Sequence, residues 1–524
     1  MNHKLLASTA FVLLGTSAAQ CRQKEEKPMN VVFFLVDDLG WSDLGCYGSR
    51  FYETPNIDRF AKEGTRFTNA YAACHVSSPS RASILSGKYP ASLNITDWLP
   101  GRLDFSFQKL RNVLINQHLP YDESTIPSIL KANGYKTAIF GKWHLGEDSA
   151  STAKQGFDIH IPNWNKGWPN KGYFSPYGLK GLEGGADGEY LTDRLTDEAL
   201  KYIEKNKDHP FFLYLSHYAV HDPIEGRPDL VEKYKKKLAM TSSSKNPPFI
   251  LEGNPDTETK SGNIVQHEGY RIFPDNTIQI KQNQDNVQFA AMVESMDESL
   301  GRVLEKLKAL GIADRTIVIF YSDNGGMSAA NFYEPERVIP ETELDKAFST
   351  SNLPLRGGKG WLYEGGIRVP LIVKWPLGGL KGATCDVPVT SPDFFPTIIE
   401  MLGIRTKSQS SKDGVSIVPL LKGETKINRD AIYWHFPHYS NHGMQSPGGA
   451  VRCGDYKLLE YYENNTVQLF NLKDDIGEQN DLSSSNPEKV NELKAMLQKW
   501  RTRVSAKMME PNPDYRLNKK TDKY

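Results

Sequence analysis

The sequence predicts an α/β protein with a mostly parallel central sheet, followed by a smaller α+β region with an antiparallel sheet. Apolar runs that end in polar residues are typical of buried parallel strands. Such runs occur at residues 31–36, 137–140, 211–215, 316–321 and 371–373. Helical patterns lie between them, and this alternation favours a sheet that is covered by helices.

Two of these helices are recognised by their ends and their spacing. Thr54 and Pro55 begin a helix with its apolar residues on one side, and Gly64 ends it. A longer helix is expected over residues 287–310, where apolar residues recur at helical spacing. Because ligands of such sheets bind beyond the carboxyl ends of the strands, the residues that follow the strands are the candidates for function.

A chain of 524 residues is longer than a domain with one hydrophobic core usually is, so we expect two domains. A main domain is predicted at residues 28–427, a smaller one at 428–510 and a tail at 511–524. The smaller domain begins where short alternating runs appear, and it ends with a helix that Asn486 caps. The polar segment 225–285 is either a solvated surface insertion or a loop that helps to hold substrate.

The overall composition is that of a folded protein whose net charge produces no strong electrostatic field. Hydrophobic residues make up 39% and charged residues 24%, which is ordinary globular usage. Lysine plus arginine and aspartate plus glutamate each number 63, so the formal net charge is zero. No global field attracts nucleic acid or an anionic membrane, and any anion site must be local.

The first 20 residues have the pattern of an export signal. Two basic residues precede an apolar run at 5–14 and a set of small residues at 15–19. Cys21 lies where a bacterial lipoprotein carries its lipid, although Gln20 before it is bulkier than such signals prefer. We expect an exported protein, periplasmic or lipid-anchored at the cell envelope. No later apolar stretch approaches the roughly 20 residues of a transmembrane helix.

The cysteines are too widely spaced for a CxxC pair or a zinc framework. They are Cys21, Cys46, Cys74, Cys385 and Cys453. We expect small buried residues, and a disulfide remains open in an oxidising compartment.

Oxygen-bearing side chains follow two of the predicted strands. Asp37 and Asp38 come after the first, and Asp323 and Asn324 come after a later one. Such ligands suit a hard cation such as calcium or magnesium. An aspartate pair after a strand is also typical of a turn or a helix cap, so both interpretations stand at this point.

A segment that begins at Ser77 bears on that choice. Pro79 and Arg81 follow Ser77, and a short helical stretch then ends at Ser86 and Gly87. This segment resembles the signature of the type I sulfatases, in which Cys or Ser, any residue, Pro, any residue and Arg precede such a helix. Other blocks typical of that family follow in the expected order over most of the chain. They are residues 36–38, 141–144, His221 with Pro223, 322–325, 357–359 and 364–368.

The resemblance implies an alkaline-phosphatase-like sandwich that hydrolyses sulfate esters, with Ser77 oxidised to formylglycine. A serine hydroxyl is a poor nucleophile without a base. An aldehyde hydrate beside a cation offers an ionisable hydroxyl and a second hydroxyl that can later expel the product. Cys74 is out of register, because Val76 and Ser78 stand where Pro and Arg would be needed. Serine-type members resemble those matured by an anaerobic-type radical sulfatase-maturing enzyme in the bacterial cytoplasm, before export.

The same resemblance assigns roles to the residues of the blocks. The implied Ca²⁺ ligands are Asp37, Asp38, Asp323, Asn324 and the modified Ser77. Arg81 would hold the hydrate, and Lys142, His221 and Lys359 would neutralise sulfate oxygens. His221 or Lys359 would assist the leaving alcohol, and His144 would deprotonate the remaining hydroxyl.

The attached group is harder to predict than the sulfate. Aromatic faces stack on sugar rings, and carboxylates or imidazoles bind sugar hydroxyls. The candidates are Asp97, Trp98, His217 and the aromatic, histidine-rich stretch 434–442 with His435 and His438. Residues 434–439 and 449–459 resemble bacterial sulfatases that act on galactose or N-acetylgalactosamine in host glycans, mucin or glycosaminoglycan, and exo-action is expected. The stretch could instead pack the domain junction.

Three alternatives remain. The first is a glycan sulfatase for N-acetylglucosamine or another sugar. The second is a phosphate or phosphonate ester hydrolase of the same superfamily, which would tend to use two metals, and no second ligand set is evident in the sequence. The third is a sugar-binding protein with an inactive sulfatase fold, against which every expected catalytic position is filled.

Overall fold

The computed structural model describes residues 27–516 except 147–150, 184, 242–243, 257–261, 264–269, 271–276, 332–336, 409–411 and 443–444. The predicted export signal and Cys21 lie outside the described residues. Within the described part, no helix has the length and apolar character needed to cross a membrane. The described cysteines, Cys46, Cys74, Cys385 and Cys453, are free thiols.

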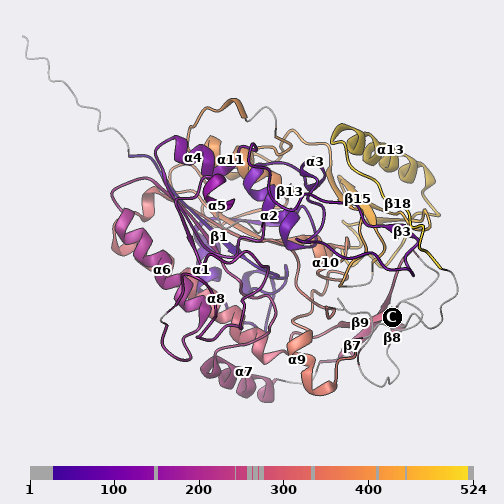
Figure 1. The fold of residues 1–524 in the computed structure, drawn as a ribbon, viewed down its shortest axis with the longest axis horizontal. Coiled ribbons are helices and arrows are strands. Elements are labelled where there is room, and N and C mark those ends of the chain that lie inside the picture. The colour runs from indigo at the N-terminus through magenta and orange to yellow at the C-terminus, as the bar shows by residue number, and fades with distance from the viewer. Residues whose placement is uncertain are drawn as a thin grey trace, which may run out of the picture.

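A nine-stranded sheet of the described residues forms the centre of the molecule (Figure 1). Its strands are β1 (Asn30–Val36), β2 (Thr65–Tyr71), β4 (Lys136–Gly141), β5 (Ile159–Ile161), β6 (Phe211–Ser216), β10 (Thr316–Ser322), β11 (Arg368–Lys374), β12 (Ala383–Cys385) and β13 (Val389–Thr390). The order is β12-β2-β11-β10-β1-β6-β4-β5, and β13 also pairs with β2. All five predicted strands are present.

One predicted strand runs in the opposite direction. The strands β10, β1, β6, β4 and β5 are mutually parallel, but β11 is antiparallel to both β10 and β2. An apolar run reports burial on both faces and not chain direction, so residues 371–373 were wrongly predicted to be parallel. The chain enters β11 directly from the short helix α10 (Glu364–Ile367), with no crossover helix between them.

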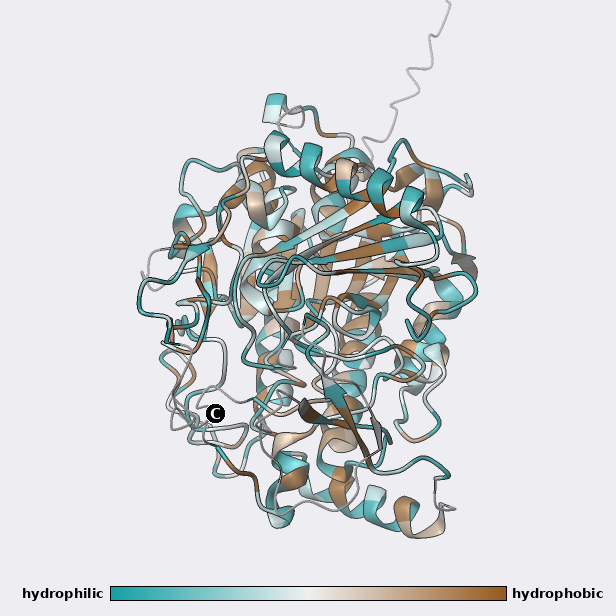
Figure 2. Cartoon of the chain, turned by 90° about the vertical axis from the view of Figure 1, so that its right-hand side faces the viewer, coloured by the Kyte–Doolittle hydropathy of each residue, from teal (hydrophilic) through white to brown (hydrophobic). Residues whose placement is uncertain are grey.

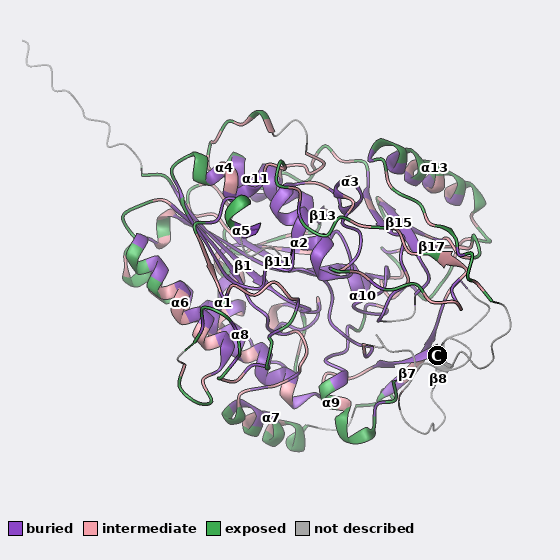
Figure 3. Ribbon diagram, viewed as in Figure 1, coloured by how far each residue is buried: buried purple, intermediate pink, exposed green. Residues whose placement is uncertain are grey.

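Two helical layers cover the sheet, and alternate residues of β1 face them. Val32 and Phe34 pack with α1 (Pro55–Glu63), α6 (Leu191–Asn206) and α8 (Val287–Ala309). Val31 and Phe33 pack with α2 (Ser77–Ser86), α4 (Ile126–Ala132) and α11 (Phe394–Met401). Hydrophobic residues mark the central strands in Figure 2, and Figure 3 shows those strands buried. The sandwich expected from the sequence is confirmed.

The shorter elements connect these layers. They are η1 (Gly45–Tyr47), α3 (Pro90–Leu93), β3 (Leu110–Arg111), α5 (Ser151–Lys154), η2 (Ala313–Arg315), η3 (Glu341–Glu343), α9 (Leu344–Ala347), η4 (Ser391–Asp393) and α12 (Val418–Leu421).

The described residues of the polar segment 225–285 form a helix and strands and not a loop alone. It contains α7 (Pro228–Met240), which buries Leu230, Val231 and Tyr234 in the core that α8 shares. It also contributes the sheet β8-β7-β9, with β7 (Phe249–Gly253), β8 (Gly262–Asn263) and β9 (Thr277–Lys281). The helix α7 was not predicted, because most of its outer surface is exposed and its composition is therefore polar (Figure 3).

The C-terminal region is the predicted α+β unit with an antiparallel sheet. The order is β14 (Ile432–Phe436), β15 (Gly448–Cys453), β16 (Tyr456–Tyr461) and β17 (Val467–Asn471). The helix α13 (Pro487–Arg503) packs on it through Leu493, Leu497 and Trp500, and Asn486 caps it by accepting a hydrogen bond from Lys489 N. Beyond this helix, β18 (Glu510–Pro511) pairs with β3 of the main domain.

A buried ion cluster joins this unit to the main domain. Lys457 of β16 is fully buried, and its Nζ lies 3.0 Å from Glu364 Oε1 of α10 and 2.9 Å from Glu478 Oε1. Tyr71 donates a hydrogen bond to Glu364 Oε2 at 2.7 Å. Removal of the lysine would deprive Glu478 of the cation paired with it and leave Glu364 with Arg368, whose Nη1 lies 3.4 Å from Glu364 Oε2.

We expect Lys457→Met to lower the free energy of unfolding by about 3–5 kcal/mol, because it breaks a buried ion pair on one side only. Lys494 offers a matched control, since its Nζ lies 3.5 Å from Glu460 Oε1 and its side chain is 43% exposed. Lys494→Met should cost less than about 1 kcal/mol. Urea unfolding of both variants measures the difference, and equal stabilities would contradict the prediction.

Candidate active site

Polar residues that follow three parallel strands meet at the carboxyl edge of the sheet. Asp37 and Asp38 follow β1, and Asp323 and Asn324 follow β10, and all four are at most 1% exposed. Lys142 follows β4 and is also buried. Because these strands are neighbours in the order β10-β1-β6-β4, residues far apart in sequence become adjacent.

The helix α2 brings Ser77 to this edge. Ser77 is the first residue of α2, which ends at Gly87 with a left-handed φ of 72°. Its Oγ donates to Asp37 Oδ1 at 3.0 Å and lies 3.3 Å from Asn324 Oδ1. Cys74 is buried near Val76 and Phe436 instead, which is a packing environment.

The acidic residues are arranged as a cation site would require. Carboxylate oxygens of Asp37, Asp38 and Asp323 all lie within 4.8 Å of one another. Asn324 donates from Nδ2 to Asp38 Oδ1 at 2.7 Å. Burial and the neighbouring charge of Asp37 raise the pKa of Asp323. Three buried carboxylates at this spacing repel one another, and a divalent cation with a preference for oxygen ligands fits among them.

Arg81 and Lys142 balance part of this charge. Arg81 Nε donates to Asp323 Oδ2 at 2.8 Å, and its Nη2 lies 3.4 Å from Asp37 Oδ1. Lys142 Nζ donates to Asp37 Oδ2 at 2.6 Å and to Ser77 Oγ at 3.2 Å. Burial raises the pKa of Asp37, but these cations outweigh it and the pKa is lowered.

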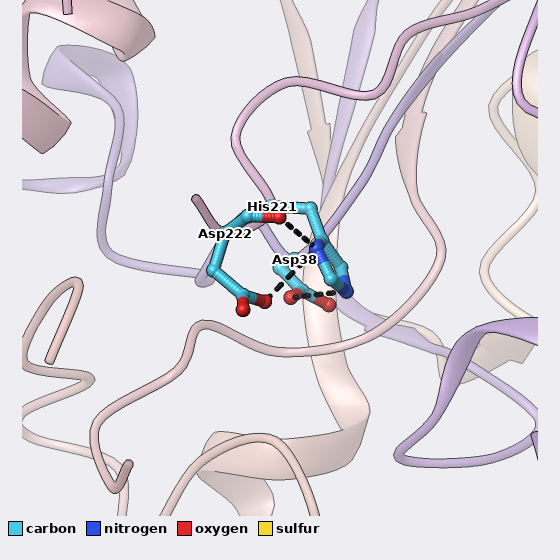
Figure 4. Close-up of side chains that lie close together, drawn as sticks. All are labelled: Asp38, His221 and Asp222. Carbon is cyan, nitrogen blue, oxygen red and sulfur yellow. Dashed lines mark hydrogen bonds and ion pairs between the residues drawn. The ribbon is translucent and has the colours of Figure 1, made fainter. Parts of the chain in front are cut away.

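A second group lies on the other side of Asp38 (Figure 4). His221 Nδ1 lies 2.9 Å from Asp222 Oδ1, and His221 Nε2 lies 3.7 Å from Asp38 Oδ2. Asp38, His221 and Asp222 are close enough to hold an ion. However, Lys359 Nζ lies 2.8 Å from Asp38 Oδ2 and 3.1 Å from His221 Nε2. The ammonium group of Lys359 therefore contacts the same atoms that a second metal ion would need as ligands, and it supplies positive charge there. Asp222 was not predicted from the sequence, since its only signal was its position after His221.

His144 is held in one orientation by its surroundings. Its backbone has a φ of 56°, and its Nε2 lies 3.0 Å from Leu99 O, which can only accept a hydrogen bond. The proton is therefore on Nε2, and Nδ1 carries a lone pair. Nδ1 is buried without a partner among the described residues. Burial and the charge of Lys142 lower the pKa of His144 well below its ordinary value.

Gly167 covers the ring of His144. A Cβ atom at position 167 would lie 2.5 Å from His144 Cε1, so only glycine allows this contact. The loop that contains Gly167 also forms one wall of the adjoining cavity.

A cavity of about 450 Å³ opens onto these groups. Its lining residues are Val76, Ser77, Trp98, Pro100, His144, Lys166, Gly167, Trp168, His221, Asn331, Lys359, Asn441 and His442. Among the predicted catalytic residues, Ser77, His144, His221 and Lys359 line the cavity, and Arg81 and Lys142 lie beneath it within reach of Asp37 and Ser77.

The structure separates the predicted substrate residues into two sets. Trp98 lines the cavity, and Asp97 is buried beside it, accepting from Trp98 N at 2.8 Å. His217, His435 and His438 are not among the described residues that line it. His217 Nε2 lies 2.9 Å from Ser299 Oγ on α8. His435 lies between Tyr462 and Lys507, and His438 bonds with Thr96.

Comparison with known proteins agrees with this geometry. The family model described as Sulfatase matches residues 29–404, and one described as N-sulphoglucosamine sulphohydrolase, C-terminal, matches residues 358–507. A sulfatase of Formosa agariphila is 31% identical over 90% of this chain and 87% of its own length. An N-acetylglucosamine-6-O-sulfatase of Bacteroides thetaiotaomicron is 27% identical over 90% of this chain and 86% of its own. The crystal structure of Ps i-CgsB in complex with k-i-k-neocarrahexaose covers 90% of this chain and 93% of its own, at a TM-score of 0.66 and 29% identity.

Proposed function

Because the chain belongs to the sulfatase family and is a sulfuric ester hydrolase, we propose that it removes sulfate from carbohydrates, with Ser77 oxidised to formylglycine as its nucleophile. The observation that supports this most directly is the position of Ser77. Ser77 lines the cavity, and its Oγ lies among Asp37, Asn324 and Lys142.

The proposed substrate is a sulfated galactose or N-acetylgalactosamine at the end of a host glycan, mucin or glycosaminoglycan. A human N-acetylgalactosamine-6-sulfatase is 29% identical over 78% of this chain and 68% of its own length, which supports this choice. The Bacteroides relative favours N-acetylglucosamine as the alternative sugar. Trp98 and Trp168 on the cavity wall offer aromatic faces on which a sugar ring of either kind could stack.

Calcium is the proposed cation, held by Asp37, Asp38, Asp323, Asn324 and the modified residue 77. When bound, it would neutralise negative charge and polarise oxygen atoms at the site. Lys142, His221 and Lys359 would face the sulfate oxygens and stabilise the charge that develops on them.

The chain's own residues would then move two protons. The ionised hydroxyl of the hydrated aldehyde at residue 77, its proton already released to solvent, attacks sulfur. The bond from sulfur to the sugar oxygen breaks, and His221 or Lys359 protonates the departing alcohol. The second hydroxyl of residue 77 gives its proton to His144 Nδ1, the carbon–oxygen bond to sulfate breaks, and the aldehyde re-forms. The lone pair on Nδ1 suits this role.

Maturation and export belong to the same proposal. An anaerobic-type radical maturing enzyme would remove two hydrogen atoms from Ser77 in the cytoplasm, before the signal at residues 1–20 directs export to the periplasm or to a lipid anchor at Cys21. Fractionation of expressing cells tests the location, and activity confined to the cytoplasm would contradict it.

Matched substrates test the reaction itself. The purified, matured enzyme should hydrolyse 4-nitrophenyl sulfate and 6-sulfated sugars faster than 4-nitrophenyl phosphate, because Lys359 occupies the place of a second cation. Faster phosphate turnover would favour the phosphatase alternative. Binding of a sulfated glycan without sulfate release would favour an inactive sugar-binding protein.

We expect Gly167→Ala to lower kcat by about 100-fold, because a Cβ at this position displaces the His144 ring by the order of 1 Å. Loss of proton transfer to His144 should also cause the sulfated enzyme to accumulate, which intact-protein mass spectrometry detects. Gly477→Ala is the control, since a Cβ there meets no atom closer than 3.2 Å. Unchanged kcat in Gly167→Ala would show that His144 tolerates the displacement.

A further inference from the structure

The C-terminal region contributes two residues to the wall of the cavity. Asn441 and His442 line it together with Ser77 and Lys359 of the main domain. Both side chains are only 4% exposed. They belong to the connection between β14 and β15, outside the blocks to which the reaction has been assigned.

The backbone of this segment is fixed against the main domain. Ser440 Oγ accepts a hydrogen bond from His442 N at 3.1 Å, and Arg102 donates to Ser440 O. Gly360, next to Lys359, has a φ of 90°, and a Cβ there would lie 2.5 Å from His442 Cβ. This close approach holds His442 at a set place relative to Lys359.

The polar atoms of the two side chains have no partner among the described residues. Both ring nitrogens of His442 and Oδ1 of Asn441 are buried and make no hydrogen bond there. A buried polar group without a partner costs roughly 1–3 kcal/mol, so such atoms beside a cavity indicate a ligand that completes them. Burial and the charge of Lys359 lower the pKa of His442 well below its ordinary value. The ring is therefore neutral, with one donor and one acceptor.

These features differ from those of the sulfate site. Lys142, His221 and Lys359 offer positive charge to an anion, whereas a neutral imidazole and an amide oxygen offer none. A hydroxyl group both donates and accepts a hydrogen bond, so it can pair with Asn441 Oδ1 and with the His442 ring. A carboxylate only accepts hydrogen bonds, and Asn441 Oδ1 has none to donate.

We propose that Asn441 and His442 determine specificity by binding a free hydroxyl of the sugar that carries the sulfate. This inference rests on the proposed function and extends it from the ester to the attached group. The preferred substrate is a neutral sugar with an unsubstituted hydroxyl near the ester, in preference to a uronic acid or an aryl sulfate.

The experiment compares two probes on each variant. One probe is the 6-sulfated sugar that the wild-type enzyme hydrolyses fastest among galactose, N-acetylgalactosamine and N-acetylglucosamine, and the other is 4-nitrophenyl sulfate, which has no sugar hydroxyl. The ratio of their kcat/KM values should fall about 10- to 100-fold in His442→Ala and Asn441→Ala, because each change removes a hydrogen bond to the sugar only. His442→Gln keeps a donor and an acceptor and should restore part of the ratio. His209→Ala, an exposed histidine elsewhere, should leave the ratio unchanged.

Deoxy analogues of the sugar probe add a second test. Removal of the recognised hydroxyl should lower kcat/KM in the wild-type enzyme and cause no further loss in His442→Ala. Melting temperatures identify any variant that fails to fold, and the remaining two variants then decide the result.

Failure of the proposed role of Asn441 and His442 can be distinguished from failure of the proposed carbohydrate sulfatase activity. If the sugar is hydrolysed and all variants keep the wild-type ratio, the inference is overturned and the proposed function stands. If the wild-type enzyme hydrolyses the aryl sulfate but no sulfated sugar, the carbohydrate proposal itself fails.

Discussion

Replacement of Ser77 with alanine is expected to reduce sulfate ester hydrolysis by roughly 10⁴-fold or more, because alanine cannot be oxidised to an aldehyde and offers no nucleophile. The expected loss is larger than for any surrounding residue, since Arg81, Lys142 and His144 act on the oxygen atoms that residue 77 provides. Single-turnover and steady-state rates on 4-nitrophenyl sulfate measure the effect.

Ser83 gives a matched control on the same helix. It is fully buried and its hydroxyl has no partner among the described residues, so Ser83→Ala should keep at least half of the wild-type rate. A peptide that spans residue 77 should be about 2 Da lighter than the unmodified sequence in the active enzyme, because oxidation removes two hydrogen atoms. Activity of Ser77→Ala within tenfold of wild type would overturn the assignment of the nucleophile.

Removal of the divalent cation is expected to lower activity by about 10³-fold, because the nucleophile and the sulfate oxygens lose their strongest neutralising charge. The folded state should lose stability as well, since Asp37, Asp38 and Asp323 would again repel one another without it. A ligand at 100 times its Kd contributes about 2.7 kcal/mol to stability, so Ca²⁺ should raise the Tm of chelator-treated enzyme.

Asp323→Asn tests whether the rise in Tm comes from Ca²⁺ bound at this site or from Ca²⁺ bound elsewhere on the protein. The variant should lose the rise in Tm on addition of Ca²⁺, whereas Asp314→Asn, an exposed change before the amino end of β10, should keep it. An equal rise in both variants would show that calcium binds elsewhere.

Much of the fold followed from the sequence because buried strands and helices have strong local patterns. The direction of β11 did not, since antiparallel and parallel strands that are buried on both faces share the same apolar pattern. The helix α7 was also missed, because its apolar residues are few and its outer surface is charged.

The candidate site divides in the same way. The residues at strand ends and in the Ser77 segment could be named because their motifs resemble those of the type I sulfatases. The histidines of the substrate set could not be placed, because neighbouring positions in a strand or loop point in different directions. His217 points to Ser299 in the helical layer, whereas His442, which lies close to Gly360, lines the cavity.

The two halves of the cavity wall have different origins in the chain. The reacting groups belong to the main domain, at the carboxyl edge of its sheet and at the start of α2. Asn441 and His442 come instead from the antiparallel unit, which Lys457 joins to the main domain. Divergence in that unit can thus retune which sugars are accepted while the desulfation chemistry is inherited intact. Conversely, an enzyme in which the Lys457 ion cluster is weakened should still cleave small aryl sulfate esters but discriminate poorly among glycans.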